Sequence, residues 1–152
     1  MTTEAAQLQF AAEFTLFIAA VAAVAITVLR PTLLFRSVAA RSSFVVGSVA
    51  LAVAAFLHGS LLLEDPADPV LVLARAAGIV GVGAALIRWE GAPEGRMLAL
   101  TGVVTLALAE ALAVGDSDRL ADGVRGVGAL LFAVALVVAS RRAIAARVAT
   151  SA

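Results

Sequence analysis

The chain has 152 residues, of which 62% are hydrophobic and 14% are charged, and its mean hydropathy is +1.07. Soluble domains carry about 25% charged residues, so this composition excludes an ordinary soluble protein. The formal net charge is zero, which gives no electrostatic reason to expect a nucleic-acid partner. Cysteine is absent and every basic residue is arginine. Disulfides, thiolate chemistry and a lysine Schiff base are therefore excluded.

Five apolar runs of 16 to 20 residues follow one another along the chain, at about 10–29, 44–63, 70–87, 97–114 and 124–139. Runs of this length cross roughly 30 Å of hydrocarbon at 1.5 Å per helical residue. Because backbone polar groups in lipid must be satisfied within the segment, the sequence predicts an all-α bundle of five transmembrane helices. We expect a single integral membrane domain, 1–152, in which a helical tail (140–152) follows the last span.

The N-terminal segment MTTEAAQLQF lacks the basic region and the small-residue cleavage site of a signal peptide. The first apolar run is therefore expected to be retained as a helix. The richness in alanine, valine, leucine, glycine and arginine is typical of a GC-rich bacterial gene. Together these features predict a multi-pass protein of the bacterial inner membrane, with the lipid bilayer as its first partner.

Arginine is distributed unequally between the two sides of the predicted bundle. The loops after the first and third spans and the tail hold Arg30, Arg36, Arg41, Arg88, Arg96, Arg141, Arg142 and Arg147. The loops of the other side hold Glu64, Asp65, Asp68, Asp116, Asp118 and Asp122, with Arg119 as the single base. The positive-inside rule then predicts an outer N-terminus and a cytoplasmic C-terminus. Arg88 and Trp89, just past the third span, are expected to anchor it at the cytoplasmic interface.

One ionisable residue lies near the outer end of each predicted span. These residues are Glu13, His58, Arg75, Glu110 and Arg125. Counted at 1.5 Å per residue, all five are expected within roughly 8 Å of the outer surface. A lone charge at the centre of a membrane helix costs about 2.5–3.5 kcal/mol on insertion scales, and pairing acids with arginines between helices would remove most of that cost.

Two interpretations of this polar layer are open. In the first, the five residues form interhelical salt bridges that only fix the order of the helices. In the second, they line an outward-facing polar site for a small ligand or a proton, and His58 is its pH-sensitive member because an imidazole titrates near neutrality.

Signatures of catalysis are absent from the sequence. There is no G-x-S-x-G, no H-E-x-x-H and no pair of carboxylates on one predicted helix. His58, Glu13 and Glu110 offer three metal ligands, but no two of them stand four residues apart on one helix, as zinc ligands often do. We therefore expect no enzyme activity, no cofactor and no metal.

The segments 44–87 and 97–139 resemble each other. The matching positions are Gly47 and Gly102, His58 and Glu110, and Arg75-x-x-Gly78 and Arg125-x-x-Gly128. A parallel two-helix repeat, related by an axis along the membrane normal, is one hypothesis for this similarity. Small-residue spacings such as Ala74/Gly78 predict close helix contacts, either within the chain or between subunits.

The leading functional hypothesis is a sensory or regulatory transmembrane module. Its outer polar site would respond to a small ligand or a proton, and its last helix would pass the change to the cytoplasm. One alternative is a small transporter or channel subunit that works as an oligomer through its glycine and alanine faces. Another is a structural accessory subunit of a membrane complex. A second copy of the chain or another membrane protein is the expected partner.

Overall fold

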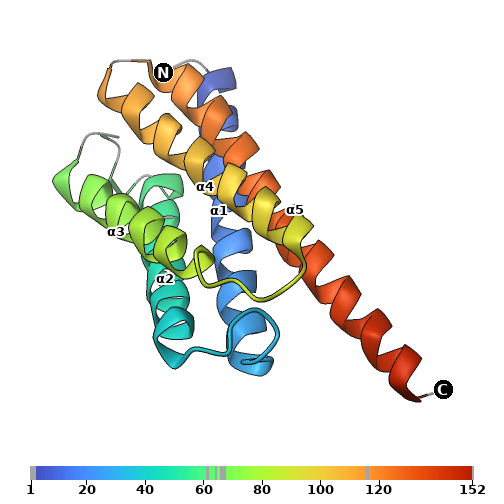
Figure 1. The fold of residues 1–152 in the computed structure, drawn as a ribbon. Coiled ribbons are helices and arrows are strands. Elements are labelled where there is room, and N and C mark those ends of the chain that lie inside the picture. Colours follow the sequence, from blue (N-terminus) through green and yellow to red (C-terminus); the bar gives the residue numbers. More distant parts are fainter. Residues whose placement is uncertain (1–2, 61, 64, 66–67, 116, 152) are drawn as a thin grey trace.

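The computed structural model describes residues 3–60, 62–63, 65, 68–115 and 117–151, with side chains omitted at 3, 142–144, 146–148 and 150–151. In this part of the chain it contains five helices, α1 (Thr3–Leu29), α2 (Val38–Gly59), α3 (Pro69–Leu86), α4 (Pro93–Val114) and α5 (Asp118–Ser151) (Figure 1). Each is long and apolar enough to cross a membrane. The predicted five-helix membrane bundle is confirmed.

The orientation of the bundle in the membrane stays a prediction. Two of the acids on which it rests, Glu64 and Asp116, lie outside the described residues, and so do the side chains of Arg142 and Arg147. The described loops agree in one respect with the prediction, because the α1–α2 loop, the α3–α4 loop and the C-terminal part of α5 lie toward the same end of the bundle (Figure 1).

Polar capping residues precede α2 and α3, and in α2 the helix begins earlier than the apolar run. α2 begins at Val38 rather than at residue 44, because the Ser37 side chain accepts a hydrogen bond from the Ala40 amide and so caps the first turn. α3 matches its expected start to within one residue. There, the Asp68 carboxylate accepts a hydrogen bond from the Val70 amide at 2.8 Å, and Pro69 occupies the first turn. Hydropathy alone does not detect such caps.

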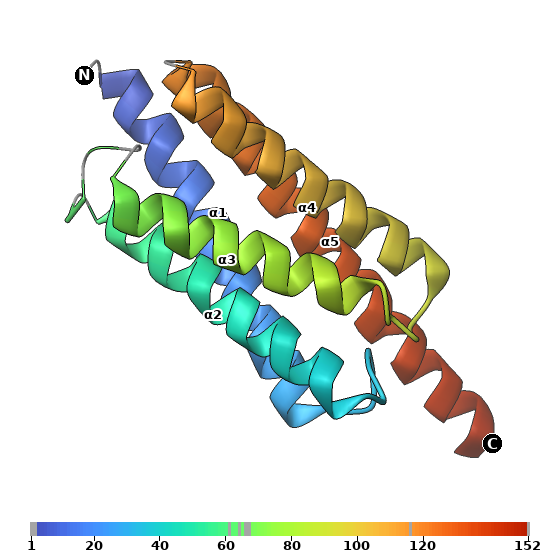
Figure 2. The ribbon, with the colours of Figure 1, turned by 60° about the vertical axis from the view of Figure 1, so that its left-hand side comes forward.

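The five helices form a closed ring in which each packs against its neighbours in chain order and α5 returns to α1 (Figure 2). The contact between α3 and α4 is the smallest of the five. Side chains fill the middle of the ring; Phe44 of α2 and Phe132 of α5, for example, lie with their ring centroids 6.0 Å apart. The outer surface exposes many valine, leucine and phenylalanine side chains, as expected for a surface that faces lipid.

Glycines bring the two helices of each hairpin into backbone contact. A Cβ atom added to Gly47 of α2 would lie 2.9 Å from the carbonyl oxygen of Gly78 in α3. The same atom on Gly102 of α4 would lie 2.9 Å from the carbonyl oxygen of Gly128 in α5. These four glycines thus serve close packing within the chain, and the two hairpins make this contact in the same way.

This shared contact corrects one part of the expected alignment between the hairpins. Matching Gly47 with Gly102 shifts α2 onto α4 by 55 positions, so that His58 aligns with Ala113 and not with Glu110. Arg75 and Arg125, by contrast, each stand three residues before the matching glycine of α3 and α5. The arginines therefore hold equivalent places in the two hairpins, whereas the histidine and the glutamate do not. A duplication of the hairpin stays a hypothesis.

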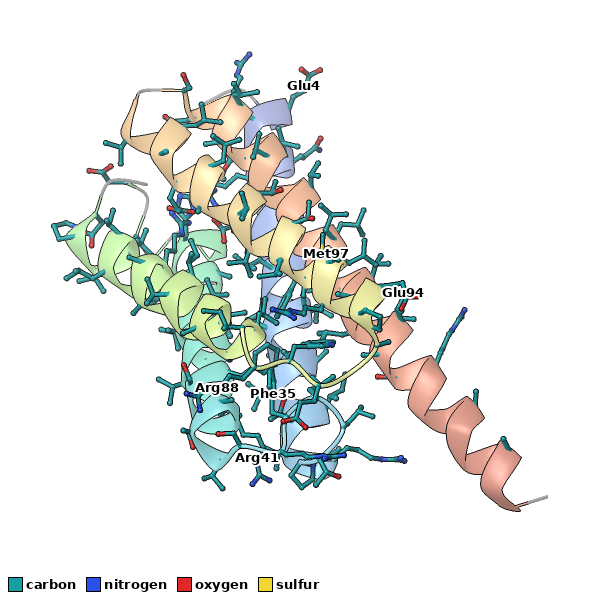
Figure 3. The ribbon with its side chains drawn as sticks, in the orientation of Figure 1. Glu4, Phe35, Arg41, Arg88, Glu94 and Met97 are labelled. Atoms are coloured by element: carbon teal, nitrogen blue, oxygen red, sulfur yellow. The ribbon has the colours of Figure 1, made fainter. Side chains whose placement is uncertain are left out.

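The two arginine-bearing loops pack together at the end opposite to Glu4 (Figure 3). Trp89 lies at this end and is only 6% exposed, because its ring packs edge-on against Phe35 with centroids 5.8 Å apart. Its indole N–H donates to the Ala92 carbonyl oxygen at 3.1 Å, so the polar group of the buried ring is satisfied. The neighbouring Arg88 is exposed, and the role of both residues as interface anchors stays a prediction.

Candidate functional site

The structure brings all five ionisable residues predicted from the spans into one cluster. The members are Glu13 of α1, His58 of α2, Arg75 of α3, Glu110 of α4 and Arg125 of α5. The cluster lies toward the end of the bundle where α1 begins and where α2 and α4 end. Every helix of the ring therefore contributes one side chain to it.

Two arginines and two glutamates alternate in a ring of charges. The Arg75 Nη2 atom donates to Glu13 Oε1 at 2.6 Å, and Arg75 Nη1 lies 3.3 Å from Glu110 Oε2. Arg125 repeats the arrangement, with Nη1 3.2 Å from Glu13 Oε1 and Nε 3.1 Å from Glu110 Oε1. Each arginine thus bridges the same two carboxylates, as the equivalent positions of the two arginines in their hairpins lead one to expect.

Two further polar residues belong to the cluster, and the hydropathy pattern of the sequence did not predict them. Asp122 accepts a hydrogen bond from Arg125 Nη1 at 2.6 Å, and the Gln9 side-chain amide lies 3.0 Å from His58 Nε2. Their spacing from predicted members could have indicated both, since residues three or four apart share one face of a helix. Gln9 precedes Glu13 by four residues, and Asp122 precedes Arg125 by three.

Three polar side chains surround the imidazole of His58. Gln9 lies at Nε2, and Glu13 and Arg75 both lie at Nδ1. Its Nδ1 atom lies 2.8 Å from Glu13 Oε1 and also 2.8 Å from Arg75 Nη2. Because Arg75 only donates and the Glu13 carboxylate only accepts, Nδ1 satisfies one of them at a time. A proton on Nδ1 favours Glu13, and a lone pair there favours Arg75. The presence of a proton on Nδ1 therefore decides whether the ring bonds to α1 or to α3. Because the Gln9 amide nitrogen only donates, its contact with Nε2 places the proton of a neutral ring on Nδ1, which then donates to Glu13, and a second proton at Nε2 would break the contact with Gln9.

The cluster is deeply buried. The side chains of Glu13, Arg75 and Arg125 are at most 1% exposed, whereas Glu110 is 21% exposed. Glu110 lies on α4 and bonds to Arg75 of α3, so the cluster reaches the surface near the smallest helix contact of the ring.

Charge and hydrogen bonding are both incompletely balanced in the cluster. Three carboxylates (Glu13, Glu110 and Asp122) face two guanidinium groups, so the net charge is −3 + 2 = −1 with a neutral imidazole and zero with a protonated one. In addition, Glu13 Oε2, Arg75 Nε and Arg125 Nη2 are buried without a hydrogen-bond partner among the described residues. Such atoms are rare in buried networks. One acceptor and two donors are therefore left for a small polar occupant or a water molecule.

Metal ligation finds no support in the described part of the chain, where no group of three or more histidine or acidic side chains could hold an ion. The carboxylates of the cluster are instead committed to the two arginines. What the arrangement offers chemically is hydrogen bonding to a small polar molecule, through the unpartnered atoms of Glu13, Arg75 and Arg125.

Comparison of the chain with protein families, with curated proteins and with solved structures gives no match.

Proposed function

We propose that this protein is a sensory or regulatory transmembrane module whose input is a change of charge or occupancy at the buried cluster. The observation that carries the proposal is the position of His58, whose Nδ1 lies between Glu13 of α1 and Arg75 of α3 and whose Nε2 faces the Gln9 amide, in a cluster that lacks one positive charge. A proton, or a small polar ligand that uses the unpartnered donors and acceptor, would change the contacts between helices.

The output element in this proposal is α5. It carries Arg125 in the cluster and extends past the rest of the bundle toward its C-terminal end (Figures 1 and 2). A helix transmits a displacement along its axis because its backbone hydrogen bonds make it rigid. Bistable packing of whole helices is a common basis for such switches, and the small α3–α4 contact is where the ring would open most easily.

The single tryptophan of the chain offers a reporter for this proposal. Trp89 lies 14 residues from Arg75, which is about 20 Å along α3 and its end, and is buried at the opposite end of the bundle. We expect the Trp89 fluorescence in nanodiscs to change when the pH is lowered. The change should be absent in His58→Gln.

Glu90 provides the control, because it is an exposed acid directly beside Trp89 and is the nearest alternative source of a pH response. The Glu90→Gln variant should keep the pH response of the natural protein. A response that survives in His58→Gln, or disappears in Glu90→Gln, would contradict a proton signal that starts at the cluster.

A structural role is the second candidate, and the dense direct pairing of Arg75 and Arg125 with carboxylates favours it. In that case the cluster only fixes helix order, and Trp89 would not respond to pH. The transporter alternative stays a prediction; Gly47, Gly78, Gly102 and Gly128 pack within the chain and lend it no support.

A further inference from the structure

A groove follows the outer side of the seam between α1 and α2. Its central cavity has a volume of about 580 Å³, and two smaller cavities adjoin it. One, of about 330 Å³, lies toward the charge cluster and shares Phe17 and Phe56 with the central cavity. The other, of about 370 Å³, lies toward the α1–α2 loop and shares Val28. The three cavities thus form one continuous surface feature.

The groove is apolar along its middle and cationic at its loop end. Valine, phenylalanine, alanine and leucine line the central cavity, with Ala25 and Ala52 as its smallest side chains. The loop-end cavity adds Arg41 and Ser42 of α2. The Arg41 Nε atom is buried and has no hydrogen-bond partner among the described residues. Figure 3 shows Arg41 at this end of the bundle.

We propose that this groove binds one phospholipid, whose acyl chain lies between α1 and α2 and whose phosphate pairs with Arg41. The length of the groove fits this occupant. From Val28 to Phe17 the α1 stretch measures 11 residues, or about 16 Å, which matches half of a hydrocarbon core roughly 30 Å thick. A lipid of one leaflet with its phosphate at Arg41 would therefore end its chain near Phe17 and Phe56.

A phospholipid explains the groove better than a second helix does. Contacts between membrane helices favour small residues along the interface, but exposed bulky side chains such as Val21, Val49 and Val53 border this groove. A flexible acyl chain adapts to such a surface and fills the part of the central cavity that Ala25 lines. An arginine whose Nε atom has no hydrogen-bond partner among the described residues, at the end of an apolar groove, also matches a phosphate in charge and hydrogen bonding. The proposal is independent of the function proposed for the charge cluster.

The test uses delipidated protein in detergent, titrated with phosphatidylglycerol and followed by native mass spectrometry. Ala25→Leu fills the centre of the groove, and Arg41→Gln removes its cation. We expect each to weaken binding of the first lipid about tenfold, an effect of the size of one lost charge-assisted hydrogen bond in the case of Arg41. The matched controls are Ala84→Leu on exposed α3 surface and Arg88→Gln at the same end of the bundle, and both should bind within about twofold of the natural protein.

Several outcomes would overturn the proposal. Equal lipid binding by Ala25→Leu and Arg41→Gln, in protein with unchanged helix content, would show that the groove is not the site. If inorganic phosphate alone binds as well as phosphatidylglycerol does, the site is an anion contact and not a lipid groove. A stable dimer that Ala25→Leu abolishes would assign the groove to a second copy of the chain.

Discussion

Replacement of Arg75 by glutamine is the change that most directly probes the energetics of the charge cluster. Arg75 is 1% exposed and contacts Glu13 at 2.6 Å, His58 at 2.8 Å and Glu110 at 3.3 Å. Its loss leaves three carboxylates facing one guanidinium group, so the net charge with a neutral imidazole becomes −3 + 1 = −2. Removing one partner of a buried ion pair costs about 3–5 kcal/mol, and we expect the free energy of unfolding to fall by that amount.

The same count of charges predicts a smaller effect for Glu13→Gln. That variant leaves two carboxylates facing two guanidinium groups, a net charge of −2 + 2 = 0, and its amide oxygen still accepts a hydrogen bond from Arg75. We therefore expect Glu13→Gln to destabilise the bundle by less than Arg75→Gln does, although Glu13 is the most deeply buried acid of the cluster. If Glu13→Gln lowers the free energy of unfolding by more than Arg75→Gln does, net charge does not govern the stability of the cluster.

The assay is equilibrium unfolding in mixed micelles, with helix content measured by circular dichroism. Arg88→Gln is the matched control, because Arg88 is an exposed arginine beyond the end of the same helix, and it should change the stability by less than about 0.5 kcal/mol. The reasoning is refuted if Arg75→Gln costs less than about 0.6 kcal/mol, the average for a single hydrogen bond between membrane helices. Arg75 would then behave as an ordinary polar contact.

Three further predictions concern packing. Gly47→Ala should destabilise the bundle by about 1–3 kcal/mol, because its Cβ would overpack the α2–α3 backbone contact. Gly123→Ala should be neutral or stabilising by up to about 1 kcal/mol, since nothing lies within 4 Å of the added atom, and unfolding midpoints of the two variants compare them directly. Phe35→Ala should cost about 3–5 kcal/mol as a large core truncation and shift the Trp89 emission to the red. If Trp89 emission stays unchanged, the two rings do not shield each other.

The sequence predicted the number of helices and the five charged members of the cluster for a simple physical reason. Hydrocarbon tolerates few polar groups, so each apolar run and each ionisable residue inside it stands out. Gln9 is uncharged and Asp122 lies before the fifth apolar run, so neither stood out, although both share a helix face with a cluster member. Burial of Trp89 against Phe35 depends on two loops that are distant in sequence, and no local pattern encodes such a contact.

The central claim of this account is that the charge cluster sets the position of α5. Because the chain has no cysteine, spin labels can be attached to cysteines introduced at the exposed positions Arg88 and Ala145, and the distance between them measured by pulsed electron paramagnetic resonance in nanodiscs. We predict that Glu13→Gln, which changes the cluster with the smaller loss of stability, shifts or broadens the distance distribution. The control Glu4→Gln, at an exposed acid in the first turn of α1, should leave it unchanged. Identical distributions in the natural protein and in Glu13→Gln would contradict the claim.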